Sequence, residues 1–537
     1  MISFGEVRFL DAVLLVFASW TFYKLLQAMR RHVRTTKLNG PPSSSWLFGV
    51  TMDVFYGDMG ALFEKWAKEY GPVYQIPAAL GKKSTVLTDP RAIAHFYSKE
   101  TYTYVNSDFT KQMIDKMIGK GLLWAEGDSH RRQRRTLSPA FTNAAIRSLT
   151  PVFFDSGYKV KAAWDSIIAS SGSEEAVIDV QKWMNCVSLD SIGIAGFGHD
   201  FGALYGRHST IEEVFDAFGT RPPAGLMILT ILLGPALPIL TRLPGKRASL
   251  VSKLHKTTQE VSEALLERSR KEKELVGISS DTSRSIIGSL LRAENSTSDL
   301  RLTEEEVLAQ MRVLLVAGYE TTSISLTWAL IELSFHPEKQ DKLRKELSEF
   351  SNRDPTYDQL MNSLPYLDAV AREVIRLHPP VEQTGRVAAC DDVVPLSIPI
   401  TTATSERVDH ITLARDTSII IPIRAINRSE DIWGPDAKEF KPERWLNSES
   451  GLTEKAKEIH GYHHILSFID GPRTCLGRPF AIAEFKSVLS VLIRNYVFGL
   501  RDGPDTKIDL VTSILPRPKV VGEEGYAMPM RVRRFEL

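Results

Sequence analysis

The segment Phe468–Gly477, Phe-Ile-Asp-Gly-Pro-Arg-Thr-Cys-Leu-Gly, constrains this 537-residue chain more than any other. It places Cys475 in a short loop with Gly471, Gly477 and a proline, directly before a predicted helix that begins near Arg478. Glycine lets the backbone approach a flat ligand closely. The N–H groups around the sulfur and the N-terminus of the following helix stabilise a thiolate. The loop therefore predicts a charged sulfur that faces a ligand.

The remaining composition narrows the class of protein. Three cysteines do not make a disulfide framework, so a reducing compartment is expected, with Cys186 and Cys390 as small buried apolar side chains. The formal net charge is +1, which gives no electrostatic reason to expect a nucleic acid partner. The 43% of hydrophobic and 24% of charged residues are typical of a globular protein.

The N-terminal segment Phe9–Met29 has its charges only near the edges, at Asp11 and Lys24. A helix of this length spans roughly 30 Å, about one hydrocarbon core. Basic residues follow at Arg30, Arg31, Arg34 and Lys37, where a cleaved signal would have small residues. We predict an uncleaved membrane anchor over residues 1–38 with the body on the cytoplasmic side, in the endoplasmic reticulum membrane. A secretory signal and a buried helix are the alternatives.

After the anchor, residues 39–45 (Asn-Gly-Pro-Pro-Ser-Ser-Ser) are predicted to be a stiff, non-helical hinge. No further linker, repeat or low-complexity tract follows, so residues 46–537 are predicted to form a single folded domain. Val73–Leu87 and Ile411–Ile423 resemble strands. The predicted helices are Gly60–Tyr70, Pro151–Ala169, Leu250–Glu274, Val307–Phe335, Tyr366–Leu377 and Arg478–Asn495. The fold class is therefore mostly α with a small β region.

Ala224–Leu240 is unusually apolar but is interrupted by prolines. It is interpreted either as a buried loop or short helix, or as a surface element that dips into the membrane.

The long helix in the middle of the chain is well specified. Thr303 and Glu306 form a predicted capping box, and His336-Pro337 ends the helix. Its centre, Ala317-Gly-Tyr-Glu-Thr-Thr322, contains poor helix formers, and the Thr321 hydroxyl is placed to bond the carbonyl of Ala317. A local defect in a well-capped helix marks a place where function is expected.

The cysteine segment resembles the ligand loop of cytochromes P450, Phe-x-x-Gly-x-Arg-x-Cys-x-Gly, at all five fixed positions. A chance match somewhere in the chain has odds of about 10⁻⁴. The resemblance implies the cytochrome P450 fold around one haem b, with Cys475 as the axial thiolate ligand. It also implies that Phe468, Gly471, Gly477 and Arg473 contact the cofactor.

Further motifs follow the order of the same family. Glu373-Val-Ile-Arg376 and Phe440-Lys-Pro-Glu-Arg444-Trp445 resemble its structural ion-pair cluster, with Trp445 in place of phenylalanine. Ala317–Thr322 resembles its oxygen-activation motif, which makes Glu320 and Thr321 the catalytic acid–alcohol pair.

The segment Gly121–Arg135 resembles the family's Trp-x-x-x-Arg element, with His130 at the tryptophan position. The resemblance implies that Arg134, Arg386 and Arg473 pair with the haem propionates, and His130 is assigned the same role. A solvated helix face and a surface for an electron donor are the alternatives for the other arginines of this run.

The resemblance covers about residues 40–520 and implies insertion of one oxygen atom from O2 into a substrate. Thiolate ligation favours O–O cleavage. Because no flavin or dinucleotide fingerprint is evident, the expected electron donor is NADPH through cytochrome P450 reductase, with cytochrome b5 as a second candidate.

Asp391–Leu396 and Ile432–Ala437 are similar to fungal members that tailor secondary metabolites. The segments implied to face the pocket are largely apolar or uncharged, which favours a lipophilic substrate such as a terpenoid. These segments are Thr101–Lys120, Arg221–Leu240, Val381–Arg386 and Thr512–Leu515. The rival hypotheses are a haem-thiolate isomerase or dehydratase that needs no electrons, and a non-catalytic haem sensor or carrier. Glu320 and Thr321 argue against the isomerase, since an enzyme that never splits O2 needs no proton relay.

We predict that Cys475→Ser yields protein without the red-shifted carbon monoxide Soret band of thiolate-ligated ferrous haem, because a serine hydroxyl does not replace a thiolate. Cys390→Ser is the control and should keep the band. A Cys475→Ser protein that retains the band would mean that another residue ligates the iron.

Overall fold

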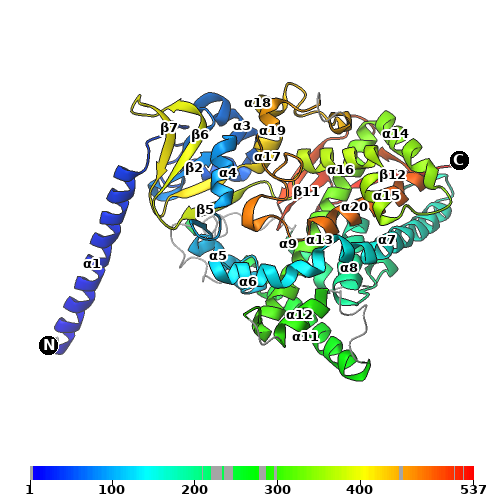
Figure 1. The fold of residues 1–537 in the computed structure, drawn as a ribbon, viewed down its shortest axis with the longest axis horizontal. Coiled ribbons are helices and arrows are strands. Elements are labelled where there is room, and N and C mark those ends of the chain that lie inside the picture. The colour runs from blue at the N-terminus through cyan, green and yellow to red at the C-terminus, as the bar shows by residue number, and fades with distance from the viewer. Residues whose placement is uncertain are drawn as a thin grey trace. The chain divides into compact units, whose positions relative to one another are not determined.

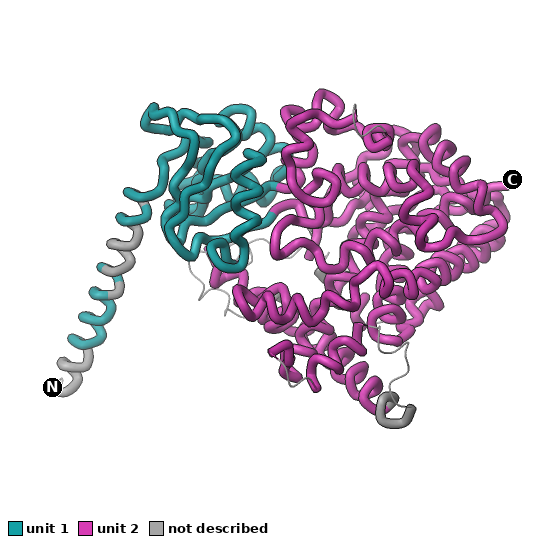
Figure 2. The backbone as a smooth tube through the Cα atoms, in the orientation of Figure 1, with its two compact units in different colours: residues 1–105, 384–422 teal, residues 106–383, 423–537 magenta. Residues whose placement is uncertain are grey.

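Strands from two distant parts of the chain share one sheet in the computed structural model. The structure describes residues 4–207, 210–218, 233–234, 246–276, 286–295, 299–446, 451–512, 514–523 and 525–536. The chain divides into two compact units (Figure 2), residues 1–105 with 384–422 and residues 106–383 with 423–537. Each is described by itself.

The first unit contains a five-stranded sheet and a separate two-stranded ribbon. The sheet order is β1 (Val73–Pro77), β2 (Lys83–Leu87), β8 (Ser418–Ile421), β5 (Thr384–Ala388) and β3 (Tyr104–Val105). The ribbon pairs β6 (Asp392–Thr401) with β7 (Arg407–Leu413). Its helices are α1 (Phe4–Arg34), α2 (Thr51–Tyr56), α3 (Met59–Tyr70) and α4 (Pro90–Ser98). The strands predicted from both segments are confirmed, and β3, β5 and β6 were not predicted. The expected burial of Cys390 was wrong, because this residue lies exposed in the connection between β5 and β6.

Helix α1 exposes a run of apolar side chains. Val13, Leu14, Leu15, Val16 and Phe17 are 49–71% exposed. Among the described helices, however, only α13 (Glu304–Phe335) is long and apolar enough to cross a membrane, and 67% of its apolar window is buried in the protein. Helix α13 is therefore a core helix, and the anchor stays a prediction.

The segment after α1 is bonded to the first unit. Arg34 Nη1 lies 2.6 Å from Asp391 Oδ2. The N–H of Thr36 donates to the carbonyl of Thr412 at 2.9 Å, and the N–H of Gln75 donates to the carbonyl of Asn39 at 2.9 Å. The residues around the predicted hinge are non-helical, as expected, but these hydrogen bonds hold its beginning against β7 and β1.

The second unit is mostly helical (Figure 1) and contains the cysteine loop. Its longer helices are α5 (Asp108–Ile118), α6 (Gly127–Leu137), α7 (Asn143–Ser170), α8 (Val180–Phe197), α9 (Thr210–Phe218), α11 (Lys246–Val276), α12 (Ile286–Glu294), α13, α14 (Pro337–Leu347), α16 (Pro365–Leu377) and α20 (Arg478–Asn495). Its short helices are α15 (Tyr357–Asn362), α17 (Ile423–Asn427), α18 (Glu430–Trp433) and α19 (Glu454–Lys457). Its strands form the sheet β4 (Glu175–Asp179), β12 (Pro529–Arg534), β9 (Tyr496–Leu500) and the hairpin β10 (Ile508–Thr512), β11 (Pro516–Val520).

All six predicted helices are present, and α20 has the predicted bounds. The start predicted for α7 at Pro151 was wrong, because the Thr142 side chain caps the helix and Pro151 lies inside it. Ala224–Leu240 lies outside the described residues, apart from Leu233 and Gly234.

The capping box and the back-bond predicted for α13 are confirmed, but the helix continues without interruption through the predicted local defect. The Thr303–Glu306 capping box is present, and the Thr321 hydroxyl donates to the carbonyl of Ala317 at 2.8 Å. A Cβ on Gly318 would lie 2.9 Å from Ile192 Cγ1 on α8. Gly318 therefore permits the close packing of α8 against α13.

We predict that deletion of residues 1–30 and deletion of residues 1–38 both move the protein from membranes toward the soluble fraction with haem incorporation preserved. The longer deletion should lower the free energy of unfolding further, by about 1–3 kcal/mol, because it also removes the backbone bonds of Thr36 and Lys37. Sedimentation, haem content and denaturant unfolding measure these effects. Loss of haem from both variants would show that the anchor is not separable from the fold.

Candidate active site around Cys475

A tight turn closes the cysteine loop in the second unit. The N–H of Cys475 donates to the carbonyl of Phe468 at 2.8 Å. Gly471 has φ +66°, a backbone conformation that favours glycine, and its carbonyl accepts the Thr474 hydroxyl at 2.7 Å. These bonds hold the thiol at the entrance of α20.

The sulfur lies in the protein interior and is still accessible. The side chain of Cys475 is exposed, yet burial raises the pKa of its thiol. Backbone N–H groups of Gly477 and Arg478 and the charges of Arg134 and Arg478 act in the opposite direction. A thiol that is both accessible and desolvated fits contact with a buried ligand.

A Cβ on Gly477 would stand 4.0 Å from the sulfur of Cys475. The φ of Gly477 is −79°, an ordinary value, so the protein backbone does not itself demand glycine. A side chain at this position would lie against the sulfur, where a flat ligand has to approach.

Arg134 on α6 is a half-buried cation beside the sulfur. Desolvation and the charges of Arg473 and Arg478 lower the pKa of Arg134, while Cys475 raises it. Within the described residues its guanidinium makes no hydrogen bond or ion pair. A desolvated cation next to two others fits an anionic ligand group, as a haem propionate would provide.

The other predicted cofactor residues have protein partners. Arg473 Nη2 lies 2.6 Å from the carbonyl of Ala125 and 2.6 Å from Glu126 Oε2. His130 is buried on α6. Arg386 lies in the first unit, where its Nε is 3.0 Å from the buried Glu100. The structure thus brings Cys475, Arg134 and Arg473 together, and the cofactor roles of these three residues and of His130 and Arg386 stay predictions.

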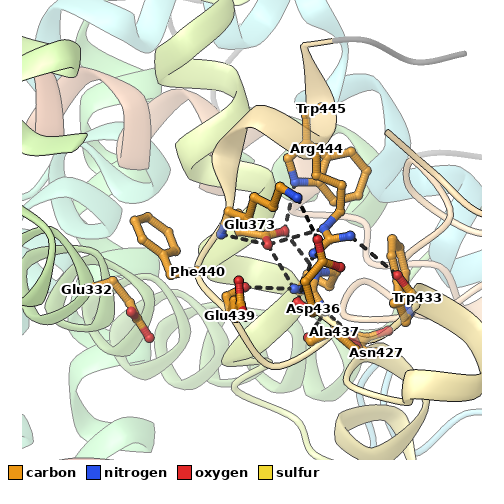
Figure 3. A network of polar contacts seen from close by, with 12 residues as sticks. Glu332, Glu373, Asn427, Trp433, Asp436, Ala437, Glu439, Phe440, Arg444 and Trp445 are labelled. Carbon is orange, nitrogen blue, oxygen red and sulfur yellow. Dashed lines mark hydrogen bonds and ion pairs between the residues drawn. The ribbon is translucent and has the colours of Figure 1, made fainter. Parts of the chain in front are cut away.

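The Glu373 carboxylate is the centre of a buried polar network (Figure 3). It accepts from Arg376 Nε and Nη2, both at 2.8 Å, and from Arg444 Nε at 3.4 Å. Trp445 Nε1–H also donates to it, at 2.9 Å. The tryptophan that replaces the family's phenylalanine therefore adds a hydrogen bond to the cluster.

This network continues to the cysteine loop. Arg376 Nη1 donates to the carbonyl of Asn427 at 2.6 Å. The side chain of Asn427 donates to Ser467 Oγ at 2.9 Å and accepts the N–H of Leu466 at 3.1 Å. Since Phe468 follows directly, the cluster fixes the start of the loop.

The carboxylate of Glu320 on α13 has a partner that the sequence did not predict. Arg517 on β11 donates to Glu320 Oε1 through Nη2 at 2.7 Å and through Nε at 3.1 Å. Both side chains are buried. No sequence signal connects residues so far apart in the chain.

Glu484 on α20 is a second buried acid that the sequence analysis missed. Desolvation raises its pKa to about 8, against the opposing effect of the Thr322 and Ser191 hydroxyls. The sequence signal that could have indicated this buried acid is the position of a glutamate within the largely apolar sequence of α20. At neutral pH this carboxyl is mostly protonated.

Comparison with known proteins gives one consistent result. The family model described as Cytochrome P450 matches residues 39–520. Cytochrome P450 monooxygenase claP of Ampulloclitocybe clavipes is 54% identical over 541 residues, 100% of both chains. Cytochrome P450 monooxygenase claW of the same fungus is 53% identical over 98% of both chains. Ganoderic acid synthetase CYP5150L8 of Ganoderma lucidum is 33% identical over 87% of this chain and 88% of its own. The predicted family and its mostly helical fold with small sheets are confirmed.

We predict that Glu373→Ala gives little holoprotein, because it leaves the buried Arg376 without its carboxylate and Arg444 with only that of Asp436, at a cost of roughly 3–5 kcal/mol. Glu439→Ala is the matched control, since only the backbone carbonyl of this exposed residue contacts Arg376. Yield and haem content are measured. Normal holoprotein from Glu373→Ala would mean that the cluster does not support the loop.

We predict that Glu484 makes stability fall as the pH rises. Its folded pKa of about 8 exceeds the ordinary 4.5, so the contribution is complete below pH 4.5 and is lost as the pH rises through about 8. Between pH 5 and 8 the loss is about 3–4 kcal/mol. Glu484→Gln should flatten this dependence in unfolding measurements, and an equal fall in both proteins would contradict the assignment.

Proposed function

Because the chain belongs to the cytochrome P450 family of monooxygenases, we propose that it inserts one oxygen atom from O2 into a lipophilic substrate by hydroxylation or epoxidation, in one or several oxidations. The observation that carries the proposal is the accessible, desolvated Cys475 thiol beside the desolvated Arg134. This site suits haem b with Cys475 as the axial ligand and Arg134 toward a propionate. Bound there, haem would supply the activation of O2.

The proposed roles of the protein groups follow from their positions. The N–H groups of Gly477 and Arg478 act against the effect of burial on the pKa of the Cys475 thiol and would favour its thiolate form as a ligand. The Thr321 hydroxyl in the centre of α13 holds a proton donor in place, and Glu320 exchanges protons with solvent. Both units fall within the family match, so we infer that they form one catalytic domain.

The partners we propose are NADPH–cytochrome P450 reductase as electron donor, with cytochrome b5 as a second one. The apolar side chains exposed on α1 support anchorage in the endoplasmic reticulum membrane with the catalytic body in the cytoplasm. The fungal relatives, one of them named ganoderic acid synthetase, support a role in tailoring a terpenoid or another secondary metabolite.

One assay tests the proposed reaction against its rivals. Purified protein, reductase and candidate terpenoids should consume NADPH and O2 in step with product. Product formed without NADPH or O2 would favour the isomerase or dehydratase. Haem binding without turnover of any terpenoid scaffold would favour a sensor or carrier.

We predict that Thr321→Ala keeps haem and substrate binding but lowers the ratio of product to NADPH oxidised, with hydrogen peroxide formed instead. Positioned acid catalysis is typically worth ~10²–10⁴ in rate, and Glu320→Gln should act in the same direction. Thr327→Ala is the matched control, because its hydroxyl bonds the Ser323 carbonyl on the same helix at 2.8 Å. An unchanged ratio in Thr321→Ala would remove this residue from the relay.

A further inference from the structure

The buried ion pair between Glu320 and Arg517 joins α13 to the β10–β11 hairpin within the second unit. The exposed fractions of the two residues are 1% and 0%. Arg517 directs both Nε and Nη2 to the same oxygen, Glu320 Oε1. Glu320 directly precedes Thr321 in α13, so the ion pair is attached to the helix at the residue next to the alcohol of the proposed relay.

The surroundings keep this pair ionised. Desolvation alone would lower the pKa of Arg517, but Glu320, Tyr319 and Tyr526 together raise it. The Arg517 guanidinium also lies over the ring of Tyr526, 4.5 Å from its centroid, and over that of Tyr319, 6.0 Å from its centroid. A carboxylate held in this way has no proton to donate.

We propose that Arg517 is a positioning residue that controls when Glu320 takes part in proton delivery. While the pair is closed, Glu320 is a fixed carboxylate. When it loosens, Glu320 takes a proton from water, passes it toward Thr321 and becomes a carboxylate again, so charge balances over each cycle. Because Arg517 belongs to β11, the position of this strand against α13 decides whether protons flow. This inference rests on the proposed function.

Other titratable groups on or against α13 have their own partners. Asp190 on α8 accepts the N–H groups of Ala203 and Leu204 at 3.1 and 2.9 Å. Glu484 on α20 lies beside Ser191 and Thr322. His255 on α11 and Asp115 on α5 both lie near Arg312. On α13 itself, Glu332 bonds His378, and on α16, Glu373 bonds Arg376. The remaining pairs are Arg344 with Asp341 on α14, Arg270 on α11 with Glu294 on α12, and Tyr496 on β9 with Asp165. Among the described contacts, Arg517 is therefore the cation that forms an ion pair with Glu320.

The test is the pH dependence of the ratio of product to NADPH oxidised. In the unmodified enzyme Glu320 stays ionised, so the ratio should be flat from pH 6 to 8.5. Arg517→Met removes the cation beside the buried carboxylate and should raise the pKa of Glu320, so that a new titration of the ratio appears. In the double variant Glu320→Gln/Arg517→Met this titration should disappear.

Two controls separate this effect from damage to the fold. Lys519→Met removes a charge from the same strand and should leave the profile flat, since Lys519 Nζ contacts only the carbonyl of Glu523 among the described contacts. Arg517→Lys keeps the charge and should also stay flat. Should Arg517→Met give no holoprotein, Arg517→Gln carries the same expectation, because its amide keeps one hydrogen bond to Glu320.

A flat profile in the charge-removing variant, or a titration that persists in the double variant, would overturn the inference. Its failure is distinct from failure of the proposed relay. If Thr321→Ala and Glu320→Gln lower the ratio while the Arg517→Met profile is flat, the relay stands and Arg517 does not control it. If neither lowers the ratio, the relay itself is absent.

Discussion

A single buried carboxylate, that of Glu373, joins the parts of the second unit that hold the cysteine loop. It binds two arginines and the indole N–H of Trp445, while Arg376 also binds the carbonyl of Asn427. Asn427 in turn holds the two residues before Phe468. A buried charge is tolerated only when its partners are complete, so each member of this network holds the others in place.

The interior resolves its charges in three different ways. Glu320 is paired with Arg517, whereas Glu484 lies, among the described residues, beside the hydroxyls of Thr322 and Ser191, and burial raises its pKa so that it is mostly protonated at neutral pH. Arg134 is desolvated without a protein counter-ion, next to Arg473, Arg478 and the Cys475 sulfur. Of these three groups, Glu320 has a counter-ion in the protein and Glu484 is mostly uncharged at neutral pH. Arg134 is therefore the one of the three whose charge fits an anionic ligand.

The centre of α13 shows how packing and chemistry share one segment. Helix α8 packs so close to Gly318 that a larger side chain would clash with Ile192, and the Thr321 hydroxyl donates to the carbonyl of Ala317. The same few residues therefore permit a tight helix crossing and present an acid and an alcohol side by side. The poor helix formers are supported by the capping box at one end and by burial along the length of the helix.

The sequence by itself determined what depends on neighbours within a few residues. The capping box, the Thr321 back-bond, the bounds of α20 and the glycine-containing cysteine loop are local hydrogen-bond and backbone preferences, and all are present. Tertiary structure alone decided the pairing of Glu320 with Arg517, the burial of Glu484 and the strands β9–β12. These features depend on segments that are far apart in the chain. Their association is governed by the entropy of closing the loops between them and by the desolvation of the buried groups, and a short sequence pattern contains neither quantity.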